Sequence, residues 1–183
     1  MGRNGRVDHC GREQPIGTSH KRADPAGRVV IIGVGNPYRR DDGVGPAVVE
    51  QLRRRGLAGV TLAECDGEPT RLLDLWADAD LAVVIDAVVT GSPRPGAIHR
   101  RSLRHPSLSG GRPTSSHGID LSGAVGLAAA LGRLPGTLLL YAVEAADTSL
   151  GVGLSPEVEA SLPAIVDEIT DLLTRPPRLR PPK

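Results

Sequence analysis

Continuous apolar runs and amphipathic segments alternate along most of the chain. Runs rich in Val, Ile and Leu predict strands over 28–33, 81–85 and 137–143, and a shorter one is expected over 60–65. An apolar run without polar alternation is typical of a strand buried on both faces of its sheet. We therefore expect a central sheet that is covered by helices.

Apolar residues recur at helical spacing between these predicted strands. Helices are expected over 44–55, 69–77, 119–131 and, after the helix-starting sequence Ser-Pro-Glu, from 156 to 174. Intervening helices favour parallel pairing of the strands that they connect. A further strand at 97–101 follows only a short Gly/Pro-rich turn, so we expect it to run antiparallel to the others.

Composition divides the chain into one domain with two polar ends. Residues 1–27 show no apolar period and are expected to form a flexible extension, and a disordered Pro/Arg-rich tail is expected over 175–183. The segment 28–174 is long enough for a single α/β domain with its own core.

Charge, aromatic content and hydropathy exclude several classes of partner. The net charge is +1 and aromatic residues make up 2% of the chain, so neither a strong field nor a base-stacking surface indicates nucleic acid. No apolar stretch approaches the roughly 20 residues that span a membrane, and no signal sequence is evident. Cys10 and Cys65 provide no disulfide framework. We expect a cytoplasmic protein.

The stretch that follows the first predicted strand carries the most distinctive chemistry. Gly33-Val34-Gly35-Asn36 forms a turn at the carboxyl end of that strand, which is the edge where open α/β sheets bind ligands. A dinucleotide fingerprint would need a third glycine at position 38, which is Tyr, and Asn36-Pro37 interrupts the passage into a helix. A nucleotide- or phosphate-binding module is therefore the weaker alternative.

The candidate ligands for a cation at this edge are Asp42, Asp86 and His117. Asp41 and Asp42 precede the first helix, where one acid would suffice for capping and a second costs repulsion unless a cation is near. Asp86 ends the strand 81–85, and His117 ends the long loop 102–116 before a helix. Oxygen and imidazole donors suit Ni, Zn, Mn or Fe. Acids at strand ends and histidines at helix starts also arise for local reasons.

The remaining polar residues have simpler interpretations. Asn36 either orients its loop through backbone hydrogen bonds or contacts substrate. His99 is expected to be a surface side chain on an edge strand, and His105 to be solvated. Cys65 is expected to be a small buried residue at a strand end rather than a nucleophile. Neither a His-Glu-X-X-His nor a Gly-X-Ser-X-Gly motif competes with the acidic site.

Several of these motifs together resemble the signature of the hydrogenase maturation proteases, which trim the large-subunit precursor of nickel–iron hydrogenase. The resemblance covers about 29–173, and its motifs are Gly33-Val34-Gly35-Asn36, Asp41-Asp42-Gly43-Val44-Gly45, Asp66-Gly67, Ile85-Asp86-Ala87-Val88, Ser116-His117-Gly118 and Gly153-Leu154-Ser155-Pro156. It implies a three-layer α/β/α fold with a five-stranded, mostly parallel sheet and one antiparallel strand.

The resemblance also implies a function and a set of site residues. It implies a metal-dependent endopeptidase that recognises nickel in the precursor and removes its C-terminal extension, with Asp42, Asp86 and His117 as metal-contacting and catalytic residues and Gly35, Asn36 and Asp41 in a substrate loop. Nickel would come from the precursor, and Zn or Cd could replace it in vitro. Some members have Glu at the position of Asp42. The alternative within this class is a nickel-checking chaperone that does not cut.

Overall fold

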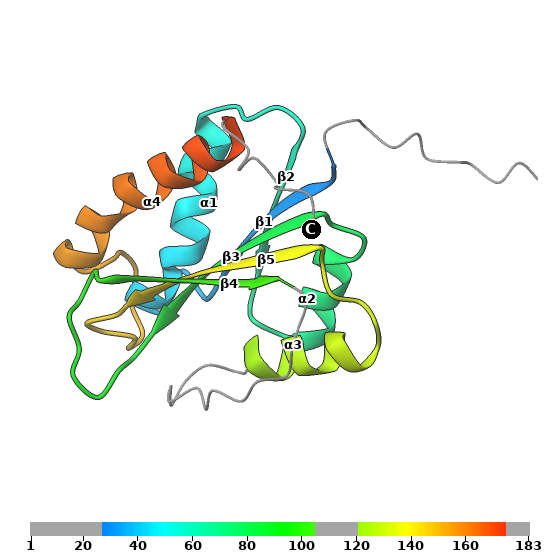
Figure 1. The fold of residues 1–183 in the computed structure, drawn as a ribbon. Helices are drawn as coiled ribbons and strands as arrows, with labels where there is room; N and C mark the ends of the chain where they lie inside the picture. The colour runs from blue at the N-terminus through cyan, green and yellow to red at the C-terminus, as the bar shows by residue number, and fades with distance from the viewer. Residues whose placement is uncertain (1–26, 105–120, 175–183) are drawn as a thin grey trace, which may run out of the picture.

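The computed structural model describes residues 27–104 and 121–174. In chain order the elements are β1 (Val29–Val34), the 3-10 helix η1 (Arg40–Gly43), α1 (Val44–Arg54), β2 (Val60–Cys65), α2 (Pro69–Trp76), β3 (Leu81–Val88), β4 (Ile98–Arg104), α3 (Leu121–Ala130), β5 (Thr137–Glu144) and α4 (Pro156–Thr174) (Figure 1). Residues 1–26 of the extension predicted over 1–27, the tail over 175–183 and the segment 105–120 lie outside the described residues.

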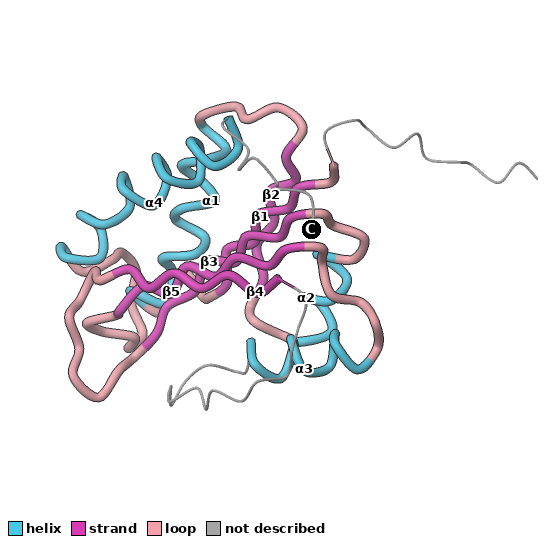
Figure 2. Tube along the Cα trace, viewed as in Figure 1, coloured by secondary structure: helices cyan, strands magenta, loops and turns pink. Residues whose placement is uncertain are grey.

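The five strands form one mixed sheet in the order β2-β1-β3-β5-β4 (Figure 2). β2, β1, β3 and β5 are parallel, and β4 pairs antiparallel with β5. This confirms the mostly parallel sheet and its single antiparallel strand. The short Gly/Pro turn explains the exception, because a parallel crossover needs a dozen or more residues.

Helices cover both faces of the sheet, which confirms the three-layer α/β/α fold. α1 and α4 pack together over one face, and α2 and α3 over the other (Figure 1). Successive residues of β1 face opposite layers, so Ile31 packs with α1 and α4 while Val30 packs with α2 and α3. Each such fully buried side chain contributes about 1.5–3 kcal/mol. No described helix is long and apolar enough to cross a membrane.

Two strands extend further than their apolar runs predicted. β3 continues through Val88, so Asp86 lies within the strand and not directly after it; the last three residues pair with β5, up to Val88 and Glu144. β4 reaches Arg104 and takes up the first residues of the predicted 102–116 loop. In both cases hydrogen bonding to β5 extends the strand beyond the point where its sequence stops being apolar.

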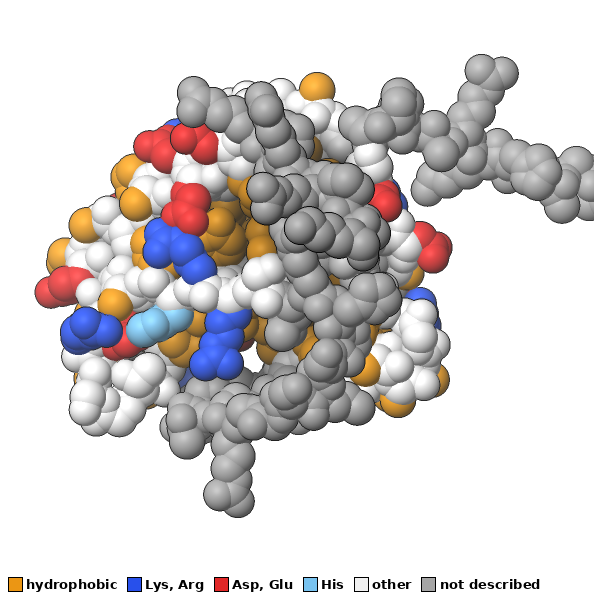
Figure 3. Space-filling view, viewed as in Figure 1, with side chains coloured by type: hydrophobic (Ala, Val, Ile, Leu, Met, Phe, Trp, Pro, Cys, Tyr) orange, Lys and Arg blue, Asp and Glu red, His pale blue; other side chains and the backbone are white. Residues whose placement is uncertain are grey.

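Surface charges of both signs are interspersed on the face shown in Figure 3. Acidic and basic side chains lie over α4 and β4, where Arg100 forms an ion pair with Glu168. Exposed pairs of this kind contribute little to stability, typically about 0–1 kcal/mol. They give the described part of this face a mixed charge rather than a field of one sign.

Glycines allow α1 to approach the sheet more closely than any other residue type would. A side-chain carbon at Gly45 would lie 2.5 Å from the backbone nitrogen of Val34 and 2.7 Å from the carbonyl oxygen of Ile85. One at Gly33 would overlap the backbone of Gly45 in turn. The start of α1 therefore rests directly on β1 and β3, at the carboxyl edge of the sheet.

We expect Gly45→Ala to destabilise the protein by about 1–3 kcal/mol, because the added methyl group would meet backbone atoms that cannot move aside. Gly126→Ala is the matched control, since nothing lies within 4 Å of a side-chain carbon at that position of α3. It should stabilise the helix by up to about 1 kcal/mol. Urea unfolding of both variants measures the two effects; equal stabilities would contradict the close-packing explanation.

Candidate active site

The turn after β1 sets the position of Asp42. Gly35 has a φ of 128°, and a side chain there would overlap the carbonyl of Asp42. The backbone N–H of Asn36 donates to the Asp42 carboxylate at 2.8 Å, and the Asn36 side-chain oxygen accepts from the backbone N–H of Tyr38 at 2.9 Å. These bonds show that Asn36 orients the turn. Its contact with substrate stays a prediction.

Asp86 lies beside Asp42 at the same edge. The last paired residues of β1 and β3 are Gly33 and Ile85, so Asp86 is the first residue of β3 beyond the pairing with β1. Burial, and to a smaller extent the negative charge of Asp42, raise the pKa of Asp86 to about 7, against a hydrogen bond from the N–H of Ala87. The two carboxylates are thus close enough to repel each other, and a bound cation would relieve both costs.

The third predicted ligand cannot be placed with these two. His117, with the Ser-His-Gly motif around it, lies outside the described residues. Within 27–104 and 121–174, no three His, Cys, Asp or Glu side chains form a group that could hold a metal ion. The structure therefore brings together Asp42 and Asp86, and the participation of His117 stays a prediction.

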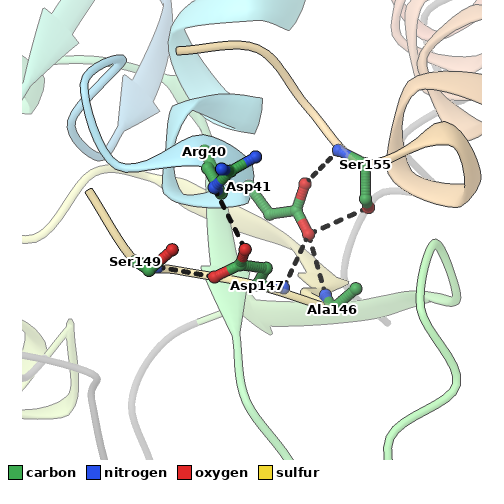
Figure 4. A network of polar contacts seen from close by, with 6 residues as sticks. All are labelled: Arg40, Asp41, Ala146, Asp147, Ser149 and Ser155. Atoms are coloured by element: carbon green, nitrogen blue, oxygen red, sulfur yellow. Dashed lines mark hydrogen bonds and ion pairs between the residues drawn. The ribbon is translucent and has the colours of Figure 1, made fainter. Parts of the chain in front are cut away.

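Asp41 points into the protein instead of toward this edge (Figure 4). Its fully buried carboxylate accepts hydrogen bonds from the backbone N–H groups of Ala146, Asp147 and Ser155 and from the Ser155 hydroxyl, at 2.6–3.0 Å. Burial opposes ionisation, but these bonds outweigh it and hold the pKa of Asp41 below its ordinary value.

The adjacency of the two acids, which favoured a cation site, is therefore explained at Asp41 without a cation. Backbone N–H groups of the segment between β5 and α4 compensate its charge, and the neighbouring acids face different surroundings. Asp41 orders the loop from which Asp42 projects. Its predicted place in a substrate loop is untested, and any effect on substrate would act through that loop.

An open depression lies next to the turn. It is lined by Gly35, Pro37, Pro46, Glu64, Cys65, Asp66 and Arg71. The backbone N–H of Gly35 donates to the carbonyl of Cys65 at 2.9 Å and so connects the carboxyl ends of β1 and β2. The depression therefore adjoins the turn that carries Asp42, through Gly35 and Pro37.

Cys65 is a buried residue at a strand end, as expected. Its side chain is 5% exposed, and burial raises the pKa of the thiol. The protonated form therefore predominates at neutral pH, and only the thiolate is an effective nucleophile. The geometry argues against a cysteine-protease mechanism that uses Cys65.

Sequence reasoning did not anticipate the ion pair between His99 and Glu144. The His99 side chain is 44% exposed, but its Nε2 lies 2.6 Å from a carboxylate oxygen of Glu144, which is 4% exposed. Glu144 also accepts from the backbone N–H of Arg94 and from the Thr90 hydroxyl. The bond from Arg94 and the His99 contact hold the pKa of Glu144 below its usual range. In the sequence, the only indication of this contact was Glu144, a charged residue at the end of an otherwise apolar strand.

Comparison with known proteins decides the family. The family profile described as HycI, hydrogenase maturation protease, matches residues 46–172. The chain belongs to the hydrogenase maturation protease family. The matched region contains Asp86 and position 117 and begins just after the Asp41-Asp42 pair. Family membership supports a hydrolase that acts on peptide bonds during hydrogenase maturation.

Individual relatives of the chain agree with this family assignment. The chain is 30% identical to the hydrogenase expression/formation protein HupD of Thiocapsa roseopersicina, over 84% of this chain and 70% of that one. It is 27% identical to the hydrogenase 2 maturation protease of Escherichia coli K12, over 78% and 88%.

Two solved structures share the fold. The [NiFe] hydrogenase maturation protease HybD from Thermococcus kodakarensis has a TM-score of 0.64 and 25% identity, covering 80% of this chain and 99% of that one. The hydrogenase maturating endopeptidase HybD from Escherichia coli has a TM-score of 0.67 and 23% identity, covering 80% and 92%. The latter likeness concerns the fold alone.

We expect Asp86→Asn to remove a pH dependence of stability from this maturation protease. The folded state holds a proton on Asp86 up to about pH 7, whereas the unfolded state loses it near 3.8. Wild-type stability should therefore fall relative to Asp86→Asn by about 3–4 kcal/mol as the pH rises from 4 to 8. Urea unfolding at both pH values measures the difference; a constant difference between the proteins would contradict the burial of this carboxyl.

Proposed function

We propose that the chain is a nickel-recognising endopeptidase that removes the C-terminal extension from the large-subunit precursor of nickel–iron hydrogenase. The observation that carries this proposal is the pair Asp42 and Asp86 at the open carboxyl edge of the sheet. Membership of a protease family supplies the reaction class. The two carboxylates repel each other, and a bound cation would relieve this repulsion. An open depression adjoins the turn that carries Asp42.

The proposed chemistry treats nickel as part of the substrate. Asp42 and Asp86 would offer oxygen ligands to nickel in the precursor, and His117 would offer an imidazole nitrogen. Such a cation anchors the precursor and can polarise the scissile carbonyl or a water. A pKa near 7 allows Asp86 to lose its proton on metal binding at neutral pH, or to accept one from water.

The nucleotide-binding alternative is less compatible with the turn. Gly33 and Gly35 approach the backbones of Gly45 and Asp42, so close packing already accounts for both glycines. The 3-10 helix η1 also separates the turn from the first N–H groups of α1. A phosphate would need those N–H groups to follow the glycine turn directly.

Purified protein incubated with nickel-loaded precursor should shorten the precursor by the mass of its C-terminal extension, measured by intact mass spectrometry. Metal-free precursor, as the matched control, should remain uncut, because the two carboxylates would lack the cation that they recognise. Binding of loaded precursor without any loss of mass would favour the chaperone alternative. Thermal stabilisation by nucleotide, but not by Ni, Zn or Cd, would favour the third alternative.

We expect Asp42→Ala, Asp86→Ala and His117→Ala each to reduce processing by at least about 100-fold, in line with the loss of a metal-contacting group. Asp42→Glu should keep activity, because it retains the carboxylate. Asp171→Asn, on the exposed surface of α4, should process at the wild-type rate. Cooperative thermal unfolding of each variant shows that the fold is intact. Full processing by Asp86→Ala would contradict the assigned site.

A further inference from the structure

Three large apolar side chains are exposed close to the candidate site. Tyr38 is 69% exposed, and Leu150 and Val152 are each 79% exposed. The other large apolar side chains of the described residues with comparable exposure, Leu127 and Leu131, belong to α3 and the turn that follows it. We call the surface formed by Tyr38, Leu150 and Val152 the apolar ledge.

Backbone hydrogen bonds join the two segments that carry the ledge. The N–H of Gly151 donates to the carbonyl of Tyr38 at 2.9 Å, and the N–H of Arg40 donates to the carbonyl of Gly151 at 3.0 Å. Arg39 and Gly151 form a parallel bridge between the same segments. Figure 1 shows the segment between β5 and α4 beside the start of α1. The two loops that carry the ledge residues are therefore joined side by side through their backbones.

Several further contacts connect the two loops. Asp41 receives its four hydrogen bonds from the segment that carries Leu150 and Val152 (Figure 4). Arg40 has a φ of 46°, an unfavourable value for a residue with a side chain, and its guanidinium lies 3.1 Å from the Asp147 carboxylate. A surface that is ordered in advance loses less conformational freedom on binding.

The ledge is continuous with the candidate site. The N–H of Tyr38 bonds to the side chain of Asn36, whose own N–H bonds to the Asp42 carboxylate. A polypeptide that brings a metal ion to Asp42 therefore binds next to the turn that carries Tyr38. Arg40, in the same turn, is paired with Asp147, so its guanidinium is already engaged within the protein.

We propose that the apolar ledge docks an apolar segment of the hydrogenase large-subunit precursor and holds it while the metal centre meets Asp42 and Asp86. This inference rests on the proposed function. It assigns substrate binding to Tyr38, Leu150 and Val152, which do not reach the reacting atoms, and gives Asp41 the role of positioning the two loops. Fixed apolar anchors of this kind commonly dominate protein interfaces.

The test compares a variant carrying Tyr38→Ser, Leu150→Ser and Val152→Ser with the wild type in processing of nickel-loaded precursor. KM should rise at least tenfold while kcat stays within twofold. Leu131→Ser is the matched control, because this exposed leucine lies just before β5 begins, at the opposite edge of the sheet, and its KM should not change. A second triple variant, Tyr38→Phe, Leu150→Met and Val152→Ile, should keep the wild-type KM.

Two outcomes would overturn the docking role. One is an unchanged KM in the serine variant with normal processing, which leaves the proposed function intact. The other is a dimer in sedimentation velocity that the serine variant abolishes, which assigns the ledge to a second copy of the chain. If the wild type cuts no precursor, the proposed function fails, and calorimetric binding of loaded precursor then tests the ledge: equal affinity of wild type and serine variant overturns it.

Discussion

The direct contact between the start of α1 and the central strands is the constraint on which the candidate site depends. Gly33 and Gly45 remove side chains from both surfaces, so the helix meets β1 and β3 backbone to backbone. The chain between strand and helix must then fold into a tight turn with a positive φ at Gly35. That turn places Asp42 over the edge of the sheet, next to Asp86. Side chains at Gly33 and Gly45 would move α1 away from the sheet and so separate the two carboxylates.

Adjacent acids have opposite roles in this turn. Asp41 is buried and serves as an acceptor for N–H groups of a segment more than a hundred positions away in the sequence, whereas Asp42 faces the edge and is held by a single backbone N–H. Asp41 stabilises the loop that carries Asp42, and the Asp42 carboxylate stays available for a ligand. Glu144 is also engaged by distant residues: it accepts from the backbone N–H of Arg94, in the segment before β4, and contacts His99 in β4.

Electrostatics at the site follow from where β1 ends. Asp86 lies beyond the last residue pair of β1 and β3 but still within β3. Its carboxyl is therefore partly buried and lies near the negative charge of Asp42. Burial and the charge of Asp42 both disfavour ionisation of Asp86. A bound cation would turn this unfavourable arrangement into a favourable one, and this is the physical basis of the nickel recognition that we propose.

The apolar runs, the helical periods and the short turn before β4 were enough to predict the sheet, its antiparallel strand and its covering helices, because these depend on local patterns of burial. The motifs around Gly33, Asp86 and Ser155 were enough to indicate the family. Tertiary structure alone decided that Asp41 turns inward, that Asp86 continues a strand, that His99 meets Glu144 and that Tyr38 lies beside Gly151. Each of these depends on a partner distant in the sequence, and a local pattern holds no information about such a partner's position.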